Sequence, residues 1–93
     1  MIRSFANNES ERVWNGEVSR RLPVHIQTVA RRKLRMLDAA QRLDDLRIPP
    51  AKRLEALKGN RAGQYSIRIN DQWRICFQWR DEQCTEVEIV DYH

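Results

Sequence analysis

Residues 65–79 read YSIRINDQWRICFQW, and this stretch decides the fold. Apolar and polar side chains alternate in two runs, which are separated by the turn-favouring residues 70–72. Alternation with a period of two is typical of a half-buried β-strand, because successive side chains of a strand point to opposite faces. The stretch therefore predicts a β-hairpin with one apolar face, made of Tyr65, Ile67, Ile69, Trp73, Ile75, Phe77 and Trp79.

The other face of this hairpin is polar, and we expect it to be uncovered. It carries Arg68 and Arg74 on short, rigid strands. A third strand is expected over residues 85–92, with alternating side chains again dividing between the two faces. In that arrangement Glu86 and Glu88 lie on the polar face and are expected to pair across strands with the two arginines.

The N-terminal half predicts helices. Residues 2–5 fit a short edge strand, and Ser10 or Asn8 can cap a short helix that Gly16 ends. Apolar residues recur every three or four positions over residues 24–43, which predicts an amphipathic helix of about five turns. Residues 51–59, after two prolines, are expected to form a short turn or 3₁₀ segment. The resulting fold class is α+β, a two-layer sandwich in which N-terminal helices back one face of a small, antiparallel-dominated sheet.

Composition restricts the class of protein. The 93 residues make a single domain, residues 1–93, and no apolar run approaches the ~18 residues needed to span a bilayer. We therefore expect a cytoplasmic protein without membrane contact. Cys76 and Cys84 lack a second pair, and His25 and His93 lie far apart, so neither disulfide nor metal-ligand spacing is indicated and no cofactor is expected.

Charge is distributed unevenly along the chain. Residues 1–80 hold all 17 Lys and Arg against 8 Asp and Glu, and four of the five residues 31–35 are basic. A chain with a pI near 9.6 is attracted to polyanions such as nucleic acid, although many small soluble domains are basic for solubility alone. Arg31 and Arg35 on the long helix fit either an RNA-backbone contact surface or a solvated face partly compensated by Asp38.

The last three residues offer acid–base chemistry. Metal-independent RNA cleavage needs a group that activates the 2′-hydroxyl, a cation beside the phosphate and a proton for the departing 5′-oxygen. Tyr92 and His93, with ordinary pKa values of about 10 and 6.5, can exchange protons beside the strand arginines. The alternative interpretation is a sheet-edge aromatic followed by a frayed terminus.

Two long segments resemble a known family. Residues 53–77, RLEALKGNRAGQYSIRINDQWRICF, and residues 87–93, VEIVDYH, are similar to the HigB or plasmid-killer toxins of the RelE and ParE superfamily. The opening IRSF and the helix segment RKLRMLDAA are similar too, so the resemblance covers nearly the whole chain. It implies a toxin of a type II toxin–antitoxin system: a ribosome-dependent messenger-RNA interferase that a helix-turn-helix, HigA-like antitoxin holds inactive.

The resemblance also implies roles for individual residues. Lys58 and Arg74 match positions that contact and stabilise the scissile phosphate, and the catalytic triplet at the end of the family matches Asp91, Tyr92 and His93. Glu55 departs from the pattern, because some members carry a catalytic histidine there; it fits a base or a residue that holds Lys58 or Arg53. RNA-binding positions are expected at Arg31, Arg35, Lys52, Arg53 and Arg68.

Two other functions are compatible with the sequence. Relatives with this fold inhibit DNA gyrase by binding it, and such a ParE-like inhibitor needs no acid–base pair. A simple RNA-binding module requires only the basic helix, but it would lack exposed aromatic stacking pairs, because Trp73, Phe77 and Trp79 are expected in the core. Tyr92 and His93 beside Lys58 and Arg74 favour the nuclease.

Overall fold

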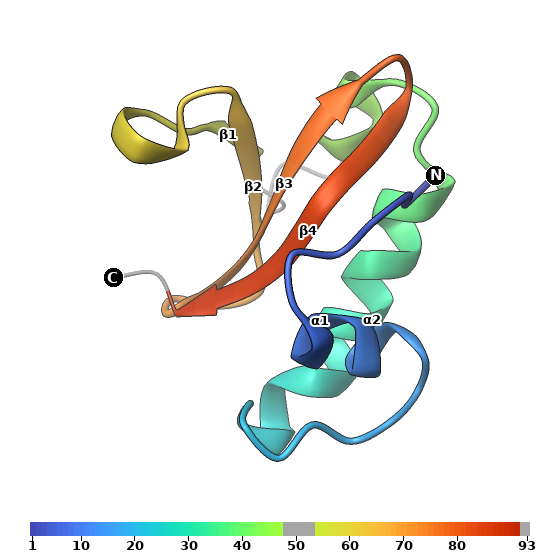
Figure 1. The fold of residues 1–93 in the computed structure, drawn as a ribbon, viewed down its shortest axis with the longest axis vertical. Helices are drawn as coiled ribbons and strands as arrows, with labels where there is room; N and C mark the ends of the chain where they lie inside the picture. Colours follow the sequence, from blue (N-terminus) through green and yellow to red (C-terminus); the bar gives the residue numbers. More distant parts are fainter. Residues whose placement is uncertain (48–53, 92–93) are drawn as a thin grey trace.

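The computed structural model, which describes residues 1–47 and 54–91, has the predicted α+β architecture (Figure 1). A four-stranded antiparallel sheet of order β1-β2-β3-β4 packs against the helices. The elements in chain order are α1 (Asn8–Trp14), α2 (Val24–Ala39), η1 (Leu43–Arg47), β1 (Glu55–Ala56), η3 (Gly59–Arg61), β2 (Gln64–Arg68), β3 (Trp73–Arg80) and β4 (Gln83–Asp91). None of the described helices has the length and apolarity that a membrane span needs.

The central hairpin is confirmed. Tyr65 lies opposite Phe77 and Ile67 opposite Ile75, and the last three of these four are buried in the core. The segment before the hairpin differs from the prediction, because Glu55 and Ala56 pair with β2 as an edge strand and the 3₁₀ turn comes later, at Gly59–Arg61. Residues 48–53, which include the first part of the predicted turn, lie outside the described residues.

The third predicted strand, β4, begins two residues earlier than expected and contains a β-bulge. Cys76 lies opposite Glu88 and Gln78 opposite Thr85, so one residue of β3 faces two residues of β4. Glu86 sits in the bulge with a φ of 53°. The extra residue shifts the alternation, and as a result Cys84, Val87 and Ile89 all face the core.

The N-terminal segment runs beside β4 in the parallel sense. Isolated bridges join Ile2 to Cys84 and Phe5 to Val87, so the expected edge strand is present but interrupted. The interruption coincides with the bulge, where the Glu86 N–H donates to Ser4 Oγ at 3.0 Å. Asp38 on α2 also holds this segment, because its Oδ1 accepts the Ile2 N–H at 2.9 Å.

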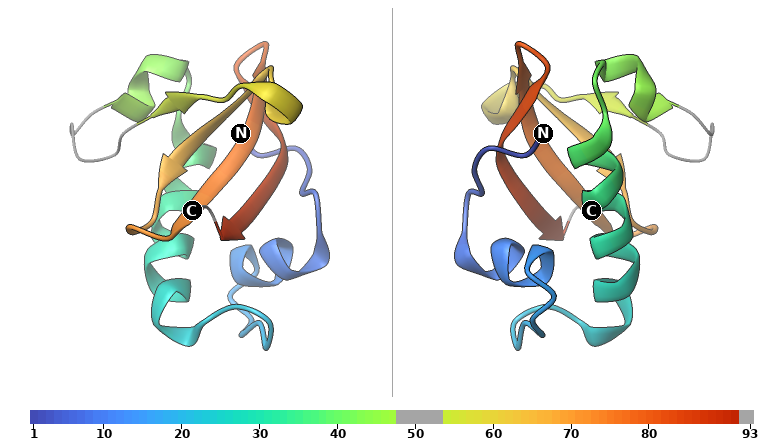
Figure 2. Two further views of the ribbon diagram at one scale, coloured as in Figure 1. Left: turned by 90° about the vertical axis from the view of Figure 1, so that its left-hand side faces the viewer. Right: turned by 90° about the vertical axis from the view of Figure 1, so that its right-hand side faces the viewer.

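Both helices pack on the same face of the sheet (Figure 2). The cap of α1 is Asn7 rather than the predicted Asn8 or Ser10, and its Oδ1 accepts the Ser10 N–H. Helix α2 ends at Ala39, four residues earlier than predicted. There Asp45 Oδ2 accepts the N–H groups of Gln41 and Arg42, which lowers the pKa of Asp45 and starts η1 in place of another helical turn.

Ser10 joins the helix layer to the sheet. The residue is fully buried in α1, and its Oγ accepts the Ile89 N–H of β4 at 2.9 Å. A buried N–H that loses its acceptor pays its desolvation cost without compensation. This contact therefore fixes the distance between α1 and the last strand.

We expect Ser10→Ala to lower the free energy of unfolding by about 1–3 kcal/mol, because it leaves the Ile89 N–H buried without that acceptor. Ser4→Ala is the matched control, since Ser4 also accepts a backbone N–H of β4 but at an exposed site. Urea denaturation followed by circular dichroism measures both. Equal losses from the two substitutions would contradict the special role of the buried bond.

Candidate active site

The polar face of the sheet is covered at its centre, contrary to expectation. Glu55, Ser66, Cys76 and Glu88 form one row across the four strands. Both central members of the row, Ser66 and Cys76, are fully buried. Ser66 and Cys76 were expected on a solvent-exposed face, but they are covered by a layer of charged side chains.

Arg74 is the best-anchored cation of this layer. Its Nη1 donates to Ser66 Oγ at 3.1 Å, and its Nη2 donates to Glu55 Oε1 at 3.2 Å. The side chain retains 17% of its exposure while that of Glu55 retains 48%. A guanidinium fixed at two points on a sheet is preorganised, so it loses little side-chain entropy when it binds an anion.

A second arginine, Arg61, crosses the same face from η3. Its Nη1 donates to Gln64 Oε1 at 3.1 Å, and its Nη2 pairs with Glu88 Oε1 at 3.3 Å. Gly59, the first residue of η3, and Gly63, two residues after its end, both have positive φ values, which favour glycine at these two positions. The sequence alone assigned no role to Arg61. Its partner Glu88 is identified only by the strand register, which places Glu88 in line with Cys76 on the polar face.

The ion pairs on this face are different from those predicted. Arg68 was expected to pair with a β4 glutamate, but it donates through Nε to Asn70 O at 3.1 Å and pairs with Asp71 in its own turn. Glu88 pairs with Arg61, and Glu86 lies in the bulge. Arg68 is therefore tied to the β2–β3 turn, beside Arg74 in the strand register.

The structure gives Glu55 a partner that the sequence did not indicate. Its carboxylate binds Arg74, whereas Lys58 or Arg53 had been expected. Lys58 is exposed and lies three residues further on, at the N-cap of η3. Glu55 thus lies where it can orient the guanidinium of Arg74.

Asp91 ends β4, opposite Trp73, and its Oδ2 accepts a hydrogen bond from Gln72 Nε2 at 3.1 Å. The carboxylate is thereby held at the same end of the sheet as Arg68 and Arg74. The other predicted site residues, Lys52, Arg53, Tyr92 and His93, lie outside the described residues. Glu55, Arg68 and Arg74 share the polar face, whereas Asp91 lies opposite Trp73 and therefore on the helix side of the sheet end.

The two arginines of α2 that were predicted to contact RNA have different surroundings. Arg35 is exposed on α2, as expected. Arg31 instead turns towards α1, where its Nε donates to Val13 O at 2.9 Å. Asp38, which was expected to offset the positive charge of this helix, also accepts the Ile2 N–H. Arg31 is thus a structural contact between the two helices, and Arg35 remains available to a ligand.

Comparison with known proteins identifies the family of this chain. A family model described as the RelE-like toxin HigB of type II toxin–antitoxin systems matches residues 3–93. The chain belongs to this HigB-like toxin family. It is 45% identical over 82 residues to Toxin HigB-1 of Vibrio cholerae serotype O1, an alignment that covers 87% of this chain and 86% of the relative.

A second relative adds an activity to the comparison. The chain is 29% identical over 93 residues, the full length of both proteins, to Endoribonuclease HigB of Proteus vulgaris. It is also 35% identical over 68 residues to an uncharacterised protein of Haemophilus influenzae, which covers 73% of this chain and 67% of that one. Membership in a toxin–antitoxin family implies that this HigB-like toxin has an antitoxin partner.

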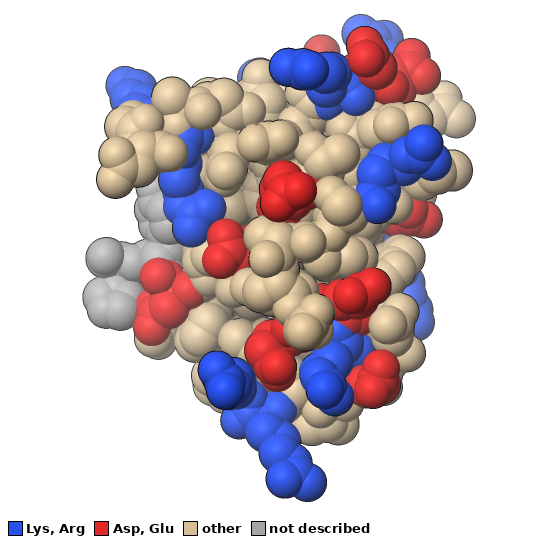
Figure 3. Space-filling model, viewed as in Figure 1, with Lys and Arg blue, Asp and Glu red and all other residues tan. Residues whose placement is uncertain are grey.

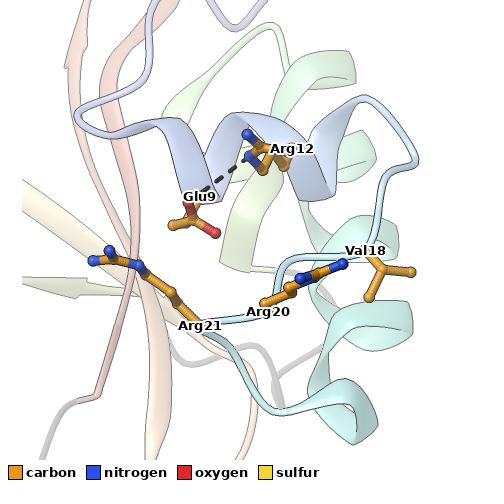
Figure 4. Close-up of a pocket in the computed structure, with 5 residues that line it drawn as sticks. All are labelled: Glu9, Arg12, Val18, Arg20 and Arg21. Carbon is orange, nitrogen blue, oxygen red and sulfur yellow. Dashed lines mark ion pairs between the residues drawn. The ribbon is translucent and has the colours of Figure 1, made fainter.

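The surface charge of the HigB-like chain is mixed on the face seen in Figure 3, where acidic side chains occupy the middle and basic ones lie mainly towards the periphery. A hollow of about 410 Å³ lies between α1 and the loop before α2 (Figure 4). It is lined by Glu9, Arg12, Val18, Arg20 and Arg21. Glu9 is already engaged there, since it accepts a hydrogen bond from Ser19 Oγ and pairs with Arg12 at 3.8 Å. This hollow is a basic surface, and the candidate active site remains on the sheet.

The two cysteines of the HigB-like chain face opposite sides of the sheet. Cys84 lies in the core, where burial raises the pKa of its thiol to about 12. Cys76 lies under the charged layer, where burial raises the pKa of its thiol and the nearby Arg61 partly opposes this effect. Both thiols are free, and both stay neutral near pH 8.

We therefore expect neither cysteine to react rapidly with a thiol reagent such as DTNB at pH 8, because the thiolate is the reactive form and both sulfurs are buried. Unfolding in urea should release both thiols and restore fast labelling at the ordinary pKa of about 8.5. The measurement is absorbance of the released chromophore over time. Rapid labelling of the native protein would show that the charged layer does not seal Cys76.

Proposed function

We propose that this HigB-like toxin is an endoribonuclease that cleaves messenger RNA on the ribosome, without a metal ion, and that a helix-turn-helix antitoxin of the HigA type holds it inactive. The observation that carries the proposal is the anchoring of Arg74 on the polar face, at the position that the family resemblance assigns to phosphate binding. The endoribonuclease name of a full-length relative supports the reaction class. The excess of basic residues supports a nucleic-acid substrate.

In the proposed reaction the 2′-oxygen of one nucleotide attacks its own 3′-phosphorus while a base accepts the hydroxyl proton. The bond between phosphorus and the 5′-oxygen then breaks as an acid gives that oxygen a proton. The products are a 2′,3′-cyclic phosphate and a 5′-hydroxyl. Tyr92 and His93 carry the two proton transfers in this proposal, by resemblance to the family.

The phosphate collects additional negative charge as it becomes five-coordinate, and Arg74 and Lys58 are proposed to stabilise that charge. Glu55 would act as a positioning residue, because its carboxylate already binds the Arg74 guanidinium. Asp91, held by Gln72, would orient the residues that follow it in the chain. Lys52, Arg53 and Arg68 are proposed to contact the RNA backbone around the site.

The decisive experiment is primer extension or ribosome profiling shortly after the toxin is induced in cells without its antitoxin. Cuts that follow the codon phase of messages are the expected result. Intact messages together with inhibited DNA gyrase would overturn the proposal in favour of a ParE-like inhibitor. Cuts in protein-free RNA, without ribosomes, would overturn the ribosome dependence alone.

Arg74→Ala should slow single-turnover cleavage by about two orders of magnitude, equivalent to about 3 kcal/mol, because a preorganised donor acts mainly on the transition state. Its affinity for programmed ribosomes should change little. Arg68→Ala is the matched control from the neighbouring strand, and it should weaken binding while the saturated rate is kept. Equal losses of affinity and rate in Arg74→Ala would refute its assignment.

The two arginines of α2 should separate into different roles. Arg35→Gln is expected to weaken ribosome association and to reduce the salt dependence of binding, because an exposed arginine contributes through phosphate contacts. Arg31→Gln should instead lower the melting temperature, since its Nε holds Val13 O. Filter binding at several salt concentrations and thermal melts test the pair. A lower saturated rate for Arg35→Gln would place that residue in the chemistry.

A further inference from the structure

Arg61 and Glu88 form an ion pair on the polar face that the proposed cleavage does not use. Arg61 is the last residue of η3, which precedes β2, and Glu88 is on β4, so the pair crosses the sheet. Glu88 lies opposite Cys76, in the row that also holds Ser66, the anchor of Arg74. The Arg61–Glu88 pair is therefore a neighbour of the candidate active site.

The contact between the two side chains leaves donors of the guanidinium free. Both Nη atoms of Arg61 reach a single carboxylate oxygen, Glu88 Oε1, at 3.3 Å. This contact is end-on, unlike the fork in which two donors meet two oxygens. Within residues 1–47 and 54–91, Arg61 Nε makes no hydrogen bond. Because a guanidinium carries five N–H donors, Arg61 can still bind a second anion.

Solvent reaches both members of the pair. The side chain of Arg61 retains 35% of its exposure and that of Glu88 retains 28%. An ion pair this open adds little to folding stability, because water screens its charges. The guanidinium is also held by Gln64 Oε1 at 3.1 Å, so it is ordered before a ligand arrives. Another anion can therefore replace the carboxylate at little cost to the fold.

The positive charges of Arg61 and Arg74 lie near each other over the sheet. Burial raises the pKa of the Cys76 thiol, and both guanidinium groups oppose that rise. Their anchors, Glu88 on β4 and Ser66 on β2, are two strand spacings apart, about 10 Å. A nucleic-acid strand carries one phosphate per nucleotide, at a spacing of about 3.4 Å along a helix axis. The two arginines are thus placed to bind different phosphates of one strand.

A phosphodiester is the anion that fits Arg61 best. It presents two non-bridging oxygens to the guanidinium fork, whereas Glu88 presents only one oxygen in this contact. Glu88 also compensates the charge of the site, which disfavours a free anion. A phosphate that belongs to a strand already held at Arg74 is favoured, because the first contact raises the effective concentration at the second.

We propose that Arg61 binds a second phosphodiester group of the messenger RNA, beside the scissile one, and that Glu88 occupies the guanidinium until the RNA arrives. The inference rests on the proposed function, because it takes the scissile phosphate to lie at Arg74. In this role Arg61 fixes the position of the strand along the polar face, and it takes no part in the proton transfers.

The decisive test compares the two members of the pair. Binding is measured on ribosomes programmed with a message that carries 2′-O-methyl groups, so that the proposed cleavage cannot occur. Arg61→Gln should weaken binding about tenfold and lower the slope of log affinity against log salt by about one. Glu88→Gln should strengthen binding and steepen that slope, because it removes the carboxylate that competes with the RNA.

A purely structural pair would give a different result. Both substitutions break the same ion pair, so both would then weaken binding through loss of an ordered face. Losses in both variants, or no change in either, would overturn the proposal. Thermal melts show whether the variants fold. If Arg61→Gln does not fold, Arg61→Lys keeps the charge and should retain the salt dependence, and the direction of the Glu88→Gln effect still decides.

Arg12 and Glu17 provide a matched control pair. They are joined at 3.8 Å beside α1, which packs on the other face of the sheet. Arg12→Gln and Glu17→Gln change the net charge by the same amounts as the two test substitutions, and we expect much smaller changes in affinity. Changes of equal size in the control pair would show that net charge alone acts, and would overturn the assignment to Arg61.

Vacant ribosomes test the source of the phosphodiester. Opposite shifts that appear only with programmed ribosomes support the messenger RNA. The same shifts with vacant ribosomes would assign Arg61 to ribosomal RNA and overturn its place beside the scissile phosphate. The proposed function fails separately: a wild-type toxin that cuts no unmodified message would refute the nuclease, whereas opposite shifts in the pair would still identify Arg61 as an RNA-binding residue.

Discussion

The bulge at Glu86 is the constraint on which the rest of the molecule depends. In a regular strand Cys84 and Val87 would face opposite sides, and one of them would be lost from the core. The bulge lets both face the helices while Glu88 stays in line with Cys76 on the polar face. One additional residue thus satisfies the hydrophobic core and the charged layer together, at the cost of a left-handed backbone conformation for a glutamate.

The charged layer shows how a small sheet can present a fixed cation. Arg74 keeps part of its surface open because Ser66 and Glu55 bind it from the side and from below. Arg61 and Glu88 form a second pair over the same row, and the two pairs together cover the thiol of Cys76. The layer protects the floor of the sheet from water, and it holds guanidinium groups in defined places for an anionic ligand.

Much of the fold follows from periodicity in the sequence. Alternation at residues 65–79 correctly predicts β2, β3 and the buried Ile67, Ile75 and Phe77. The ends of elements were less accurate, because they depend on single side chains such as Asp45, which stops α2 early through its own hydrogen bonds. The bulge could not be read from the pattern, since it arises from the fit of β4 to three neighbours at once.

The sequence supplied candidate site residues but not the contacts that they make. The family resemblance selected Arg74 and Glu55, yet only the strand register shows that these two bind each other. The contact of Arg31 with the Val13 carbonyl was not predicted, because helical spacing gives the direction of a side chain and not the group of another element that it meets. Trp79 packs against the core, as alternation predicts, but it is only half-buried because the pairing of β2 with β3 stops at Gln78.

The parallel pairing of residues 1–6 with β4 has a consequence for synthesis of the chain. The segment made first waits for partners, Cys84 and Val87, that are made about eighty positions later. Until those residues leave the exit tunnel, neither the sheet edge nor the Ser10 contact can form. The N-terminal segment therefore stays without its β4 partners through most of the synthesis of residues 1–93, and the order of synthesis is the reverse of what this sheet edge needs.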